Sequence, residues 1–237
     1  MSGHVLTIDW NQALTEMGAG VFQKGHFVLS SRGHCREYGN FVVPVNINHR
    51  LFELICVGLI DLLNMEIFTI NRTAVLLGIG TGAFYAHQMS LKLNRSLSRD
   101  KSKRMECSFA FAVRRPDGTL TLPYDQSSLI NDQAVIFVDD VFATGKTYFE
   151  VGNLIQNAGG TPMQAVFILN RALPAIDQVA RQSNFISQPK CLLHKFLEIW
   201  ASREACFLCK QGMPFSTEFG KGPEEFHLHG QPPWPKE

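Results

Sequence analysis

Short apolar runs lie in the middle of the chain and are separated by stretches with helical spacing. The runs are Ala74–Leu77, Cys107–Val113, Val135–Val138 and Ala165–Leu169. Apolar runs of this length without strict alternation are typical of strands that are buried on both faces of a parallel sheet. We therefore predict an α/β fold with an open, mainly parallel sheet flanked by helices, whose crossover connections are right-handed.

Two of the intervening stretches, Phe84–Asn94 and Tyr148–Ala158, are predicted to be helices. In the second, apolar residues recur at i, i+3, i+4 and i+7, at Val151, Leu154, Ile155 and Ala158. Thr147 and Glu150 have the spacing of a capping box, which predicts where this helix begins. The pair Gly159-Gly160 supplies a left-handed stop, which predicts where it ends.

The two ends of the chain do not follow this alternation. Residues Leu51–Met65 are predicted to form an amphipathic or buried helix, too short and too polar to span a bilayer. The segment Gly220–Glu237 has neither helical nor strand periodicity, so we expect it to be loosely structured. We expect three parts: an N-terminal hood and helix at 1–66, an α/β core at 67–190, and a C-terminal extension at 191–237. The outer parts are expected to cover the carboxyl edge of the sheet, where open α/β folds bind ligands.

Composition narrows the class of protein. The chain has 237 residues, 45% of them hydrophobic and 18% charged, as in ordinary globular proteins. With 22 Lys and Arg against 21 Asp and Glu, the net charge is +1. This balance argues against nucleic acid or a membrane as the main partner. The N-terminus lacks the features of a secretory signal, so we expect a cytoplasmic protein with reduced cysteines.

The segment with the clearest chemistry begins at Val135 and ends at Thr147. A strand runs into Asp139-Asp140, and a loop of small and hydroxyl side chains then leads into a helix. Adjacent carboxylates repel each other and raise each other's pKa, so hydroxyl donors would relieve them. The free amides of a helix N-terminus suit a phosphate group. A nucleoside-triphosphate P-loop is excluded, because Asp140 stands where that motif requires its first glycine.

The segment Val138–Thr147 resembles the phosphoribosyl-pyrophosphate (PRPP) motif of type I phosphoribosyltransferases, with Phe142 as a departure. The resemblance implies that Asp139 and Asp140 hold the two ribose hydroxyls. It also implies that the following loop binds the 5-phosphate of PRPP, through Val141, Ala143, Thr144, Gly145, Lys146 and Thr147.

The likeness extends over most of the chain and points to orotate phosphoribosyltransferases of the bacterial and archaeal type. Gly25–Tyr38 is similar to that group's G-H-F-x-L-x-S-G-x-H-S-x-x-Y motif, with Arg32 and Cys35 as departures. In the family this stretch helps to cover the orotate ring. The resemblance therefore implies that Ser31 and His34 contact the base; Lys24, just before the motif, is a candidate for the pyrophosphate.

Two further segments resemble the parts of this family that bind pyrophosphate. Leu77–Ala83 is similar to the pyrophosphate loop, which implies that role for Gly78, Ile79, Gly80, Thr81 and Gly82. Phe111–Leu122 is similar to the strand and mobile catalytic loop, which implies catalytic roles for Arg114 and Arg115. The family carries more cations beyond this point, whereas residues 116–132 here contain no Lys or Arg. Cations in such a loop neutralise the negative charge that develops on the leaving pyrophosphate, so we expect their absence to reduce the activity.

Two segments near the end of the sheet and of the chain complete the resemblance. Leu169-Asn170-Arg171 resembles the family's L-x-R segment, in which the arginine pairs with the orotate carboxylate. Cys206–Pro214 is close to the family's C-terminal C-P-L-C-x-x-G-x-P segment. Two interpretations of the C-x-x-C stay open: a pair of reduced structural thiols, or a Zn²⁺ site. In the second, Cys191 and His194 are the candidates that join Cys206 and Cys209.

The resemblance implies a transferase that attaches ribose 5-phosphate from PRPP to a nucleobase, with orotate as the base, in pyrimidine nucleotide synthesis. Mg²⁺ is expected to arrive with PRPP and to have no direct protein ligand, and the family implies a homodimer. A different class stays open: a non-catalytic sensor or scaffold that binds PRPP. A transferase for a purine or another base is a third hypothesis, which would leave Arg171 without a carboxylate partner.

Overall fold

The computed structural model describes residues 8–16, 20–71, 73–97, 106–171 and 182–232. The chain divides into two compact units. Residues 48–195 form one, which we call the sheet unit, and residues 1–47 together with 196–237 form the other, the terminal unit. The helix expected at Leu51–Met65 lies in the sheet unit, and the three-part division at residues 66 and 190 stays a prediction.

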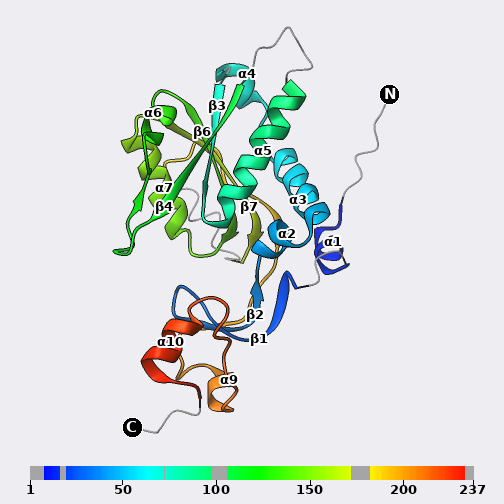
Figure 1. The fold of residues 1–237 in the computed structure, drawn as a ribbon, viewed down its shortest axis with the longest axis vertical. Helices are drawn as coiled ribbons and strands as arrows, with labels where there is room; N and C mark the ends of the chain where they lie inside the picture. The colour runs from blue at the N-terminus through cyan, green and yellow to red at the C-terminus, as the bar shows by residue number, and fades with distance from the viewer. Residues whose placement is uncertain (1–7, 17–19, 72, 98–105, 172–181, 233–237) are drawn as a thin grey trace. The chain divides into compact units, whose positions relative to one another are not determined.

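The sheet unit is an α/β structure whose strands alternate with helices (Figure 1). Its six-stranded sheet has the order β5-β4-β3-β6-β7-β8, and all neighbours are parallel except the short edge strand β5. The strands are β3 (Thr73–Ile79), β4 (Glu106–Arg114), β5 (Leu120–Thr121), β6 (Ala134–Phe142), β7 (Thr161–Asn170) and β8 (Lys190–His194). The four predicted strands and their parallel pairing are thus confirmed, and the fold class with them.

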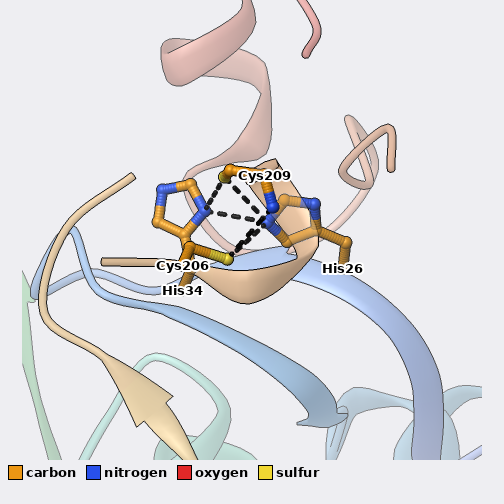
Figure 2. Close-up of side chains that lie close together, drawn as sticks. All are labelled: His26, His34, Cys206 and Cys209. Carbon is orange, nitrogen blue, oxygen red and sulfur yellow. Dashed lines mark hydrogen bonds between the residues drawn. The ribbon is translucent and has the colours of Figure 1, made fainter. Parts of the chain in front are cut away.

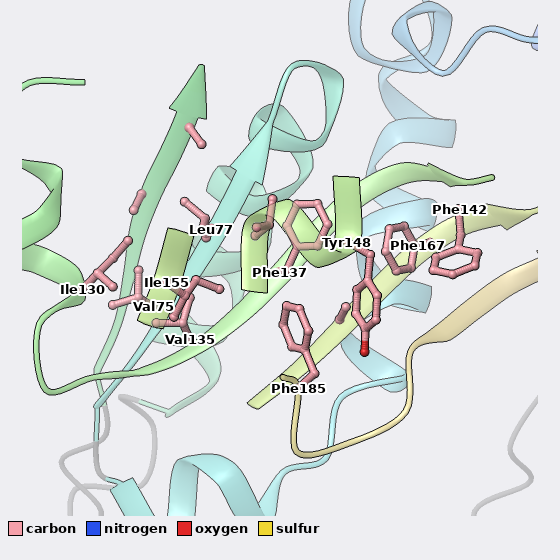
Figure 3. Packing of buried hydrophobic residues seen from close by; sticks show 14 residues of the cluster. Val75, Leu77, Ile130, Val135, Phe137, Phe142, Tyr148, Ile155, Phe167 and Phe185 are labelled. Atoms are coloured by element: carbon pink, nitrogen blue, oxygen red, sulfur yellow. The ribbon is translucent and has the colours of Figure 1, made fainter. Parts of the chain in front are cut away.

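Helices cover both faces of this sheet (Figure 1). The longer ones are α3 (His49–Asp61), α5 (Thr81–Leu97) and α7 (Lys146–Asn157), and the shorter ones are α4 (Glu66–Asn71) and α6 (Gln126–Ile130). The core on the α7 side contains aromatic side chains from both layers (Figure 3), among them Phe137, Phe142, Tyr148, Phe167 and Phe185. This packing fixes α7 against the carboxyl half of β6 and β7, because Phe142 and Tyr148 lie edge to face with their ring centroids 5.8 Å apart.

The start of α7 differs from the prediction. The residue before the helix is Gly145, in the left-handed region at φ +81°, and no side chain caps the helix. The capping box at Thr147 and Glu150 is therefore wrong. The Glu150 carboxylate instead accepts from Arg114 at 2.7 Å and lies 3.8 Å from the Lys146 ammonium. The predicted stop is confirmed, since Gly159 has φ +80° directly after the helix.

The terminal unit is built around a three-stranded antiparallel sheet with the order β1-β2-β9. The strands are β1 (Phe22–Val28), β2 (His34–Gly39) and β9 (Ile199–Trp200). The helices are α1 (Trp10–Glu16), α2 (Val42–Asn46), α9 (Phe207–Lys210) and α10 (Gly222–His229). A small apolar cluster of Phe27, Leu29 and Cys35, with Tyr38 and Phe219 against it, stabilises the β1-β2 hairpin.

Helix α10 corrects the expectation of a loosely structured tail. A proline in its first turn and Glu224 and Glu225 beside it favour a helix start, although the segment lacks apolar periodicity. Glu224 also accepts from Arg32 at 2.8 Å. Residues 233–237, the remainder of the expected tail, lie outside the described residues. In the part of the chain that the structure describes, no helix combines the length and apolarity needed to cross a membrane.

Candidate functional site

The acid pair lies near the carboxyl end of β6, a central strand of the sheet unit. Asp139 is buried, with 9% of its surface exposed, and Asp140 is partly buried. The backbone N–H of Asp140 donates to Oδ1 of Asp139 at 2.9 Å, so the first carboxylate has a fixed orientation. In parallel sheets this edge is where ligands bind. The strand therefore presents two carboxylates at an edge that is suited to a ligand.

Both carboxyl groups titrate above their ordinary range. Burial is the main cause for Asp139, and the charge of Asp140 adds to it, so its pKa lies well above the usual value. Burial also raises the pKa of Asp140, while backbone N–H donors and the positive charge of Arg171 oppose that rise. Such a pair is strained when no partner is bound, and two hydroxyl donors would relieve it. The electrostatics thus favour a ligand with adjacent hydroxyl groups.

The loop that follows the acid pair runs from Ala143 to Thr147 and leads into α7. The hydroxyl of Thr144 accepts from the backbone N–H of Lys146 at 3.4 Å, and the Lys146 side chain is exposed. Gly145 adopts a left-handed conformation that lets the chain turn tightly before the helix begins. The first amides of α7 have no partner within the helix, which makes this turn suitable for a phosphate group.

The loop after β3, by which we mean Gly80 together with the first residues of α5, lies directly against the acid pair. A Cβ atom added to Gly82 would be 2.4 Å from the carbonyl oxygen of Val138 and 2.9 Å from Oδ1 of Asp139. Gly80, in the same loop, has φ +50° and no atom within 4 Å of its added Cβ. The structure therefore brings the predicted pyrophosphate loop and the predicted ribose-binding acids together, and only glycine fits at Gly82.

Arg114 and Arg115 lie at the end of β4, in a hairpin with β5. The hairpin is closed by the N–H of Arg115, which donates to the carbonyl of Thr119 at 2.9 Å. Both arginines are exposed, but the Arg114 guanidinium pairs with Glu150 on α7. Its charge also lowers the pKa of Asp139, although burial outweighs that effect. Arg114 is therefore near the acid pair, and it would have to leave Glu150 to bind an anion.

Arg171 follows the last residue of β7, the strand beside β6. Its backbone N–H donates to the carbonyl of Phe142 at 3.0 Å, which holds this residue against the end of the neighbouring strand. Its charge acts on Asp140, since it opposes the rise of that carboxyl's pKa. The guanidinium thus acts electrostatically on the acid pair, and its pairing with an orotate carboxylate, which the resemblance implies, stays a prediction.

The other predicted site residues belong to the terminal unit. Lys24 lies on β1 with an exposed side chain, and Ser31 lies in the exposed turn between β1 and β2. His34 is buried, and its Nδ1 atom lies 2.8 Å from Nε2 of His26 and 3.3 Å from Sγ of Cys209. The base-binding roles of Ser31 and His34 stay predictions, although the inward direction of His34 opposes such a role.

The four predicted zinc ligands do not lie together: two are in the terminal unit and two are in the sheet unit. Cys206 and Cys209 are buried at α9, together with His26 and His34 (Figure 2). Cys191 and His194 lie on β8 of the sheet unit, and the group of metal-ligand side chains found among the described residues does not include them. His194 contacts Asn170, and burial raises the pKa of the Cys191 thiol to about 12.

Sequence reasoning assigned His34 to the base and gave His26 no role. The two histidines flank a hairpin turn and lie about 170 to 180 residues before the C-x-x-C, so spacing does not link the four positions. The available signal was that the two histidines and two cysteines form a complete ligand set for zinc.

Comparison with known proteins identifies the fold. No family model matches the chain. An orotate phosphoribosyltransferase from Aeropyrum pernix is 19% identical, with a TM-score of 0.54, over 76% of this chain and 92% of that chain. An adenine phosphoribosyltransferase from Saccharomyces cerevisiae is 18% identical, with a TM-score of 0.52, over 77% and 99%. The orotate phosphoribosyltransferase from Mycobacterium tuberculosis with inorganic phosphate is 17% identical, with a TM-score of 0.50, over 78% and 95%.

These proteins are named for different bases, orotate and adenine, and their structures share one fold with this chain. The chain thus has the type I phosphoribosyltransferase fold: a mainly parallel sheet flanked by helices, as the sequence predicts.

Proposed function

We propose that this protein, which has the type I phosphoribosyltransferase fold, transfers ribose 5-phosphate from PRPP to a nucleobase, and that the base is orotate. One observation carries the proposal. The pair of buried Asp139 and partly buried Asp140 lies near the end of β6, and a small-residue loop then leads into the N-terminus of α7. Carboxylates for two hydroxyls and amides for one phosphate, at this spacing, match the ribose 5-phosphate part of PRPP.

The proposed reaction is a displacement at the anomeric carbon of the ribose. The bond from this carbon to the pyrophosphate oxygen breaks, and the pyrophosphate leaves with the bonding electrons. A ring nitrogen of the base supplies the electron pair for the new bond, and the proton that this nitrogen carried is lost to solvent. Positive charge develops on the sugar, so two carboxylates on its hydroxyls would stabilise the transition state electrostatically. The chain's main contribution is to hold both reactants in line.

Mg²⁺ fits this site as an ion carried by the substrate. The acids at the edge of β6 offer oxygen donors only, and Mg²⁺ prefers oxygen ligands and is commonly held by substrate phosphates with water. When bound, it supplies positive charge that offsets the leaving pyrophosphate. The residues that would hold its substrate are Asp139, Asp140 and the Gly78–Gly82 loop. The homodimer and the cytoplasmic location stay predictions.

Arg171 supports orotate as the base. Its guanidinium lies near Asp140, at the end of the strand beside the acid pair. A planar guanidinium suits a carboxylate through two parallel hydrogen bonds. Orotate carries a carboxylate, whereas adenine does not, so a base without that group would leave this cation without its proposed role.

A second candidate function is a sensor or scaffold that binds PRPP without turnover. It is favoured by the hairpin after β4, because residues 116–132 contain no Lys or Arg and Arg114 is paired with Glu150. A leaving pyrophosphate would then meet fewer cations than such transition states ordinarily require. Under the enzyme hypothesis, the same feature predicts slow turnover.

The variant Arg171→Ala tests the choice of base. We expect its KM for orotate to rise about 10- to 100-fold, as for the loss of hydrogen bonds to a charged group, with PRPP affinity within about 2-fold of wild type. Orotate consumption followed by absorbance, with PRPP binding measured by calorimetry, checks both. Arg171→Lys is the matched control: it keeps the charge but loses the bidentate geometry, so its KM should be intermediate.

The results of this assay test both the role of Arg171 and the choice between an enzyme and a sensor. An unchanged KM for orotate in Arg171→Ala would overturn the assignment of this residue. PRPP binding without consumption of orotate, adenine or other bases by the wild type would favour the sensor.

A further inference from the structure

The terminal unit contains a buried cluster of two histidines and two cysteines that the proposed transfer reaction does not use. His26, His34, Cys206 and Cys209 each have at most 7% of their surface exposed. Their potential ligand atoms all lie within 4.8 Å of one another. Figure 2 shows the four side chains converging on one point from the β1-β2 hairpin and from α9.

The distances between these atoms are close to those of a tetrahedral zinc site. Nε2 of His26 lies 3.5 Å from each of the two sulfur atoms, and Nδ1 of His34 lies 3.3 Å from Sγ of Cys209. The two nitrogen atoms are 2.8 Å apart. Zn–N and Zn–S bonds in a tetrahedron give edges of about 3.3 Å between two nitrogens and about 3.6 Å between nitrogen and sulfur. These four distances are therefore slightly shorter than the matching edges of a filled site, and the remaining pairs of ligand atoms lie within 4.8 Å of each other.

The hydrogen bonds around the cluster orient His26 for a metal. Its Nδ1 atom lies 2.7 Å from the carbonyl oxygen of Met213, and a carbonyl can only accept. Nδ1 therefore carries the proton, and the lone pair of Nε2 faces the cluster. Histidines that bind metals ordinarily donate their second ring N–H in this way. The ring is further held by Phe215, which lies edge-on to it at 5.9 Å.

The surroundings fit a closed structural site rather than a catalytic one. Leu208 and Trp200 pack against the two cysteines, and Phe215 also lies edge-on to His34. Zn²⁺ with two thiolates and two neutral imidazoles has no net charge, which suits a buried position. Four protein ligands leave no position open for a substrate.

We propose that His26, His34, Cys206 and Cys209 bind one structural Zn²⁺, which joins the N-terminal hairpin to the C-terminal segment. On binding, each thiol loses its proton to solvent and forms a Zn–S bond, and the proton on Nδ1 of His34 moves to Nε2 of the same ring. No oxidant or reductant is needed. The site would stabilise a unit whose two halves are separated by the whole sheet unit in sequence, and whose apolar clusters are small.

The first test is the zinc content of the full-length protein, purified under reducing conditions without a histidine tag. We expect about one Zn²⁺ per chain by mass spectrometry, and less than about a tenth of that in the Cys206→Ser/Cys209→Ser double variant. Cys191→Ser and Cys107→Ser are matched controls, since each removes a free thiol outside the cluster, partly buried at Cys191 and buried at Cys107, and they should keep the metal.

The second test begins with the wild-type chain, so its main result does not depend on whether a variant folds. Titration of the zinc-depleted wild-type chain with Co²⁺ should give a thiolate charge-transfer band together with the visible absorption of a tetrahedral site. His34→Ala should weaken Co²⁺ binding by more than about 100-fold, beyond the 10- to 100-fold typical of losing a supporting group. His34→Cys should restore binding with a spectrum shifted toward three thiolates.

Three results would overturn the proposal. They are zinc retained in the double Ser variant, zinc lost in Cys191→Ser, or a wild-type Co²⁺ spectrum without a thiolate band. A disulfide between Cys206 and Cys209 that forms in place of metal binding, detected by thiol titration before reduction, would likewise contradict it. None of these measurements uses PRPP binding, so their results test this inference independently of the proposed function.

Discussion

The burial of Asp139 and Asp140 makes their charged forms costly for the stability of the free protein. Both carboxyls have raised pKa values, for which burial is the main cause. The folded protein therefore binds these protons more tightly than the unfolded chain does. The stability that this gives is full below the ordinary pKa of aspartate, and it is lost as the pH rises through the raised pKa of the pair.

The variant Asp139→Asn tests whether the buried charge lowers the stability of the free protein. Its amide oxygen can still accept from the N–H of Asp140, while the buried charge is removed. We expect the free energy of unfolding at pH 7 to rise by about 1 kcal/mol and its dependence on pH to become flatter. Urea unfolding between pH 4 and pH 8 measures both. Asp132→Asn, an exposed carboxyl in the same unit, is the control and should change neither. A less stable Asp139→Asn at pH 7 would contradict the account.

Single residues also show where sequence patterns fail. Thr147 and Glu150 have capping-box spacing, but Glu150 is drawn to Arg114 and Lys146, and Gly145 makes the turn without a cap. His34 matches a family motif, yet its ring is directed into the cluster with His26. In both cases, partners distant in sequence or a backbone conformation decide the outcome, and a local pattern contains neither.

At the scale of elements, the candidate site depends on how closely the loop after β3 approaches the end of β6. Gly82 is the contact point, since an added Cβ would lie 2.4 Å from the Val138 carbonyl oxygen. The strands pair in parallel with Gly78 opposite Val138, so this register brings the two loops to the same edge. The sequence predicts both loops, but their separation follows only from the register.

The variant Gly82→Ala should therefore shift one loop or the other. We expect a loss of about 1–3 kcal/mol in the free energy of unfolding, as for overpacked sites, and PRPP binding should weaken as well. Chemical denaturation and calorimetry measure the two effects. Gly80→Asn is the control, because it has open space and asparagine tolerates its positive φ, so its loss should stay below about 1 kcal/mol. Equal stability of Gly82→Ala and wild type would contradict the close approach.

The elements of the sheet unit were predictable where apolar runs were long and continuous. The runs within β3, β6 and β7 correspond to strands that are mostly buried, so their composition alone indicates them. The run within β4 also forms a strand, but several of its side chains are exposed, so its predicted burial on both faces is wrong. Strand β8 was missed, because its residues are mostly half-buried or exposed and it lies at the edge. Helix α10 was missed because its start depends on Pro223 and two glutamates rather than on apolar periodicity.

At the scale of the whole molecule, the fold is shared by phosphoribosyltransferases that act on different bases, so the fold alone does not select the substrate. Three features of this chain's charges bear on the proposed function. Arg171 stands beside the acid pair, Arg114 is paired with Glu150, and residues 116–132 contain no Lys or Arg. Under the proposed function, this arrangement would favour binding of PRPP over fast release of pyrophosphate.

The most direct test of the central claim is calorimetric titration of the full chain with PRPP in the presence of Mg²⁺. The account predicts one binding site per chain in the wild type and loss of binding in the Asp139→Asn/Asp140→Asn double variant. Asp132→Asn should bind as the wild type does. Absence of binding to the folded wild type, or undiminished binding in the double variant, would contradict the assignment of this site.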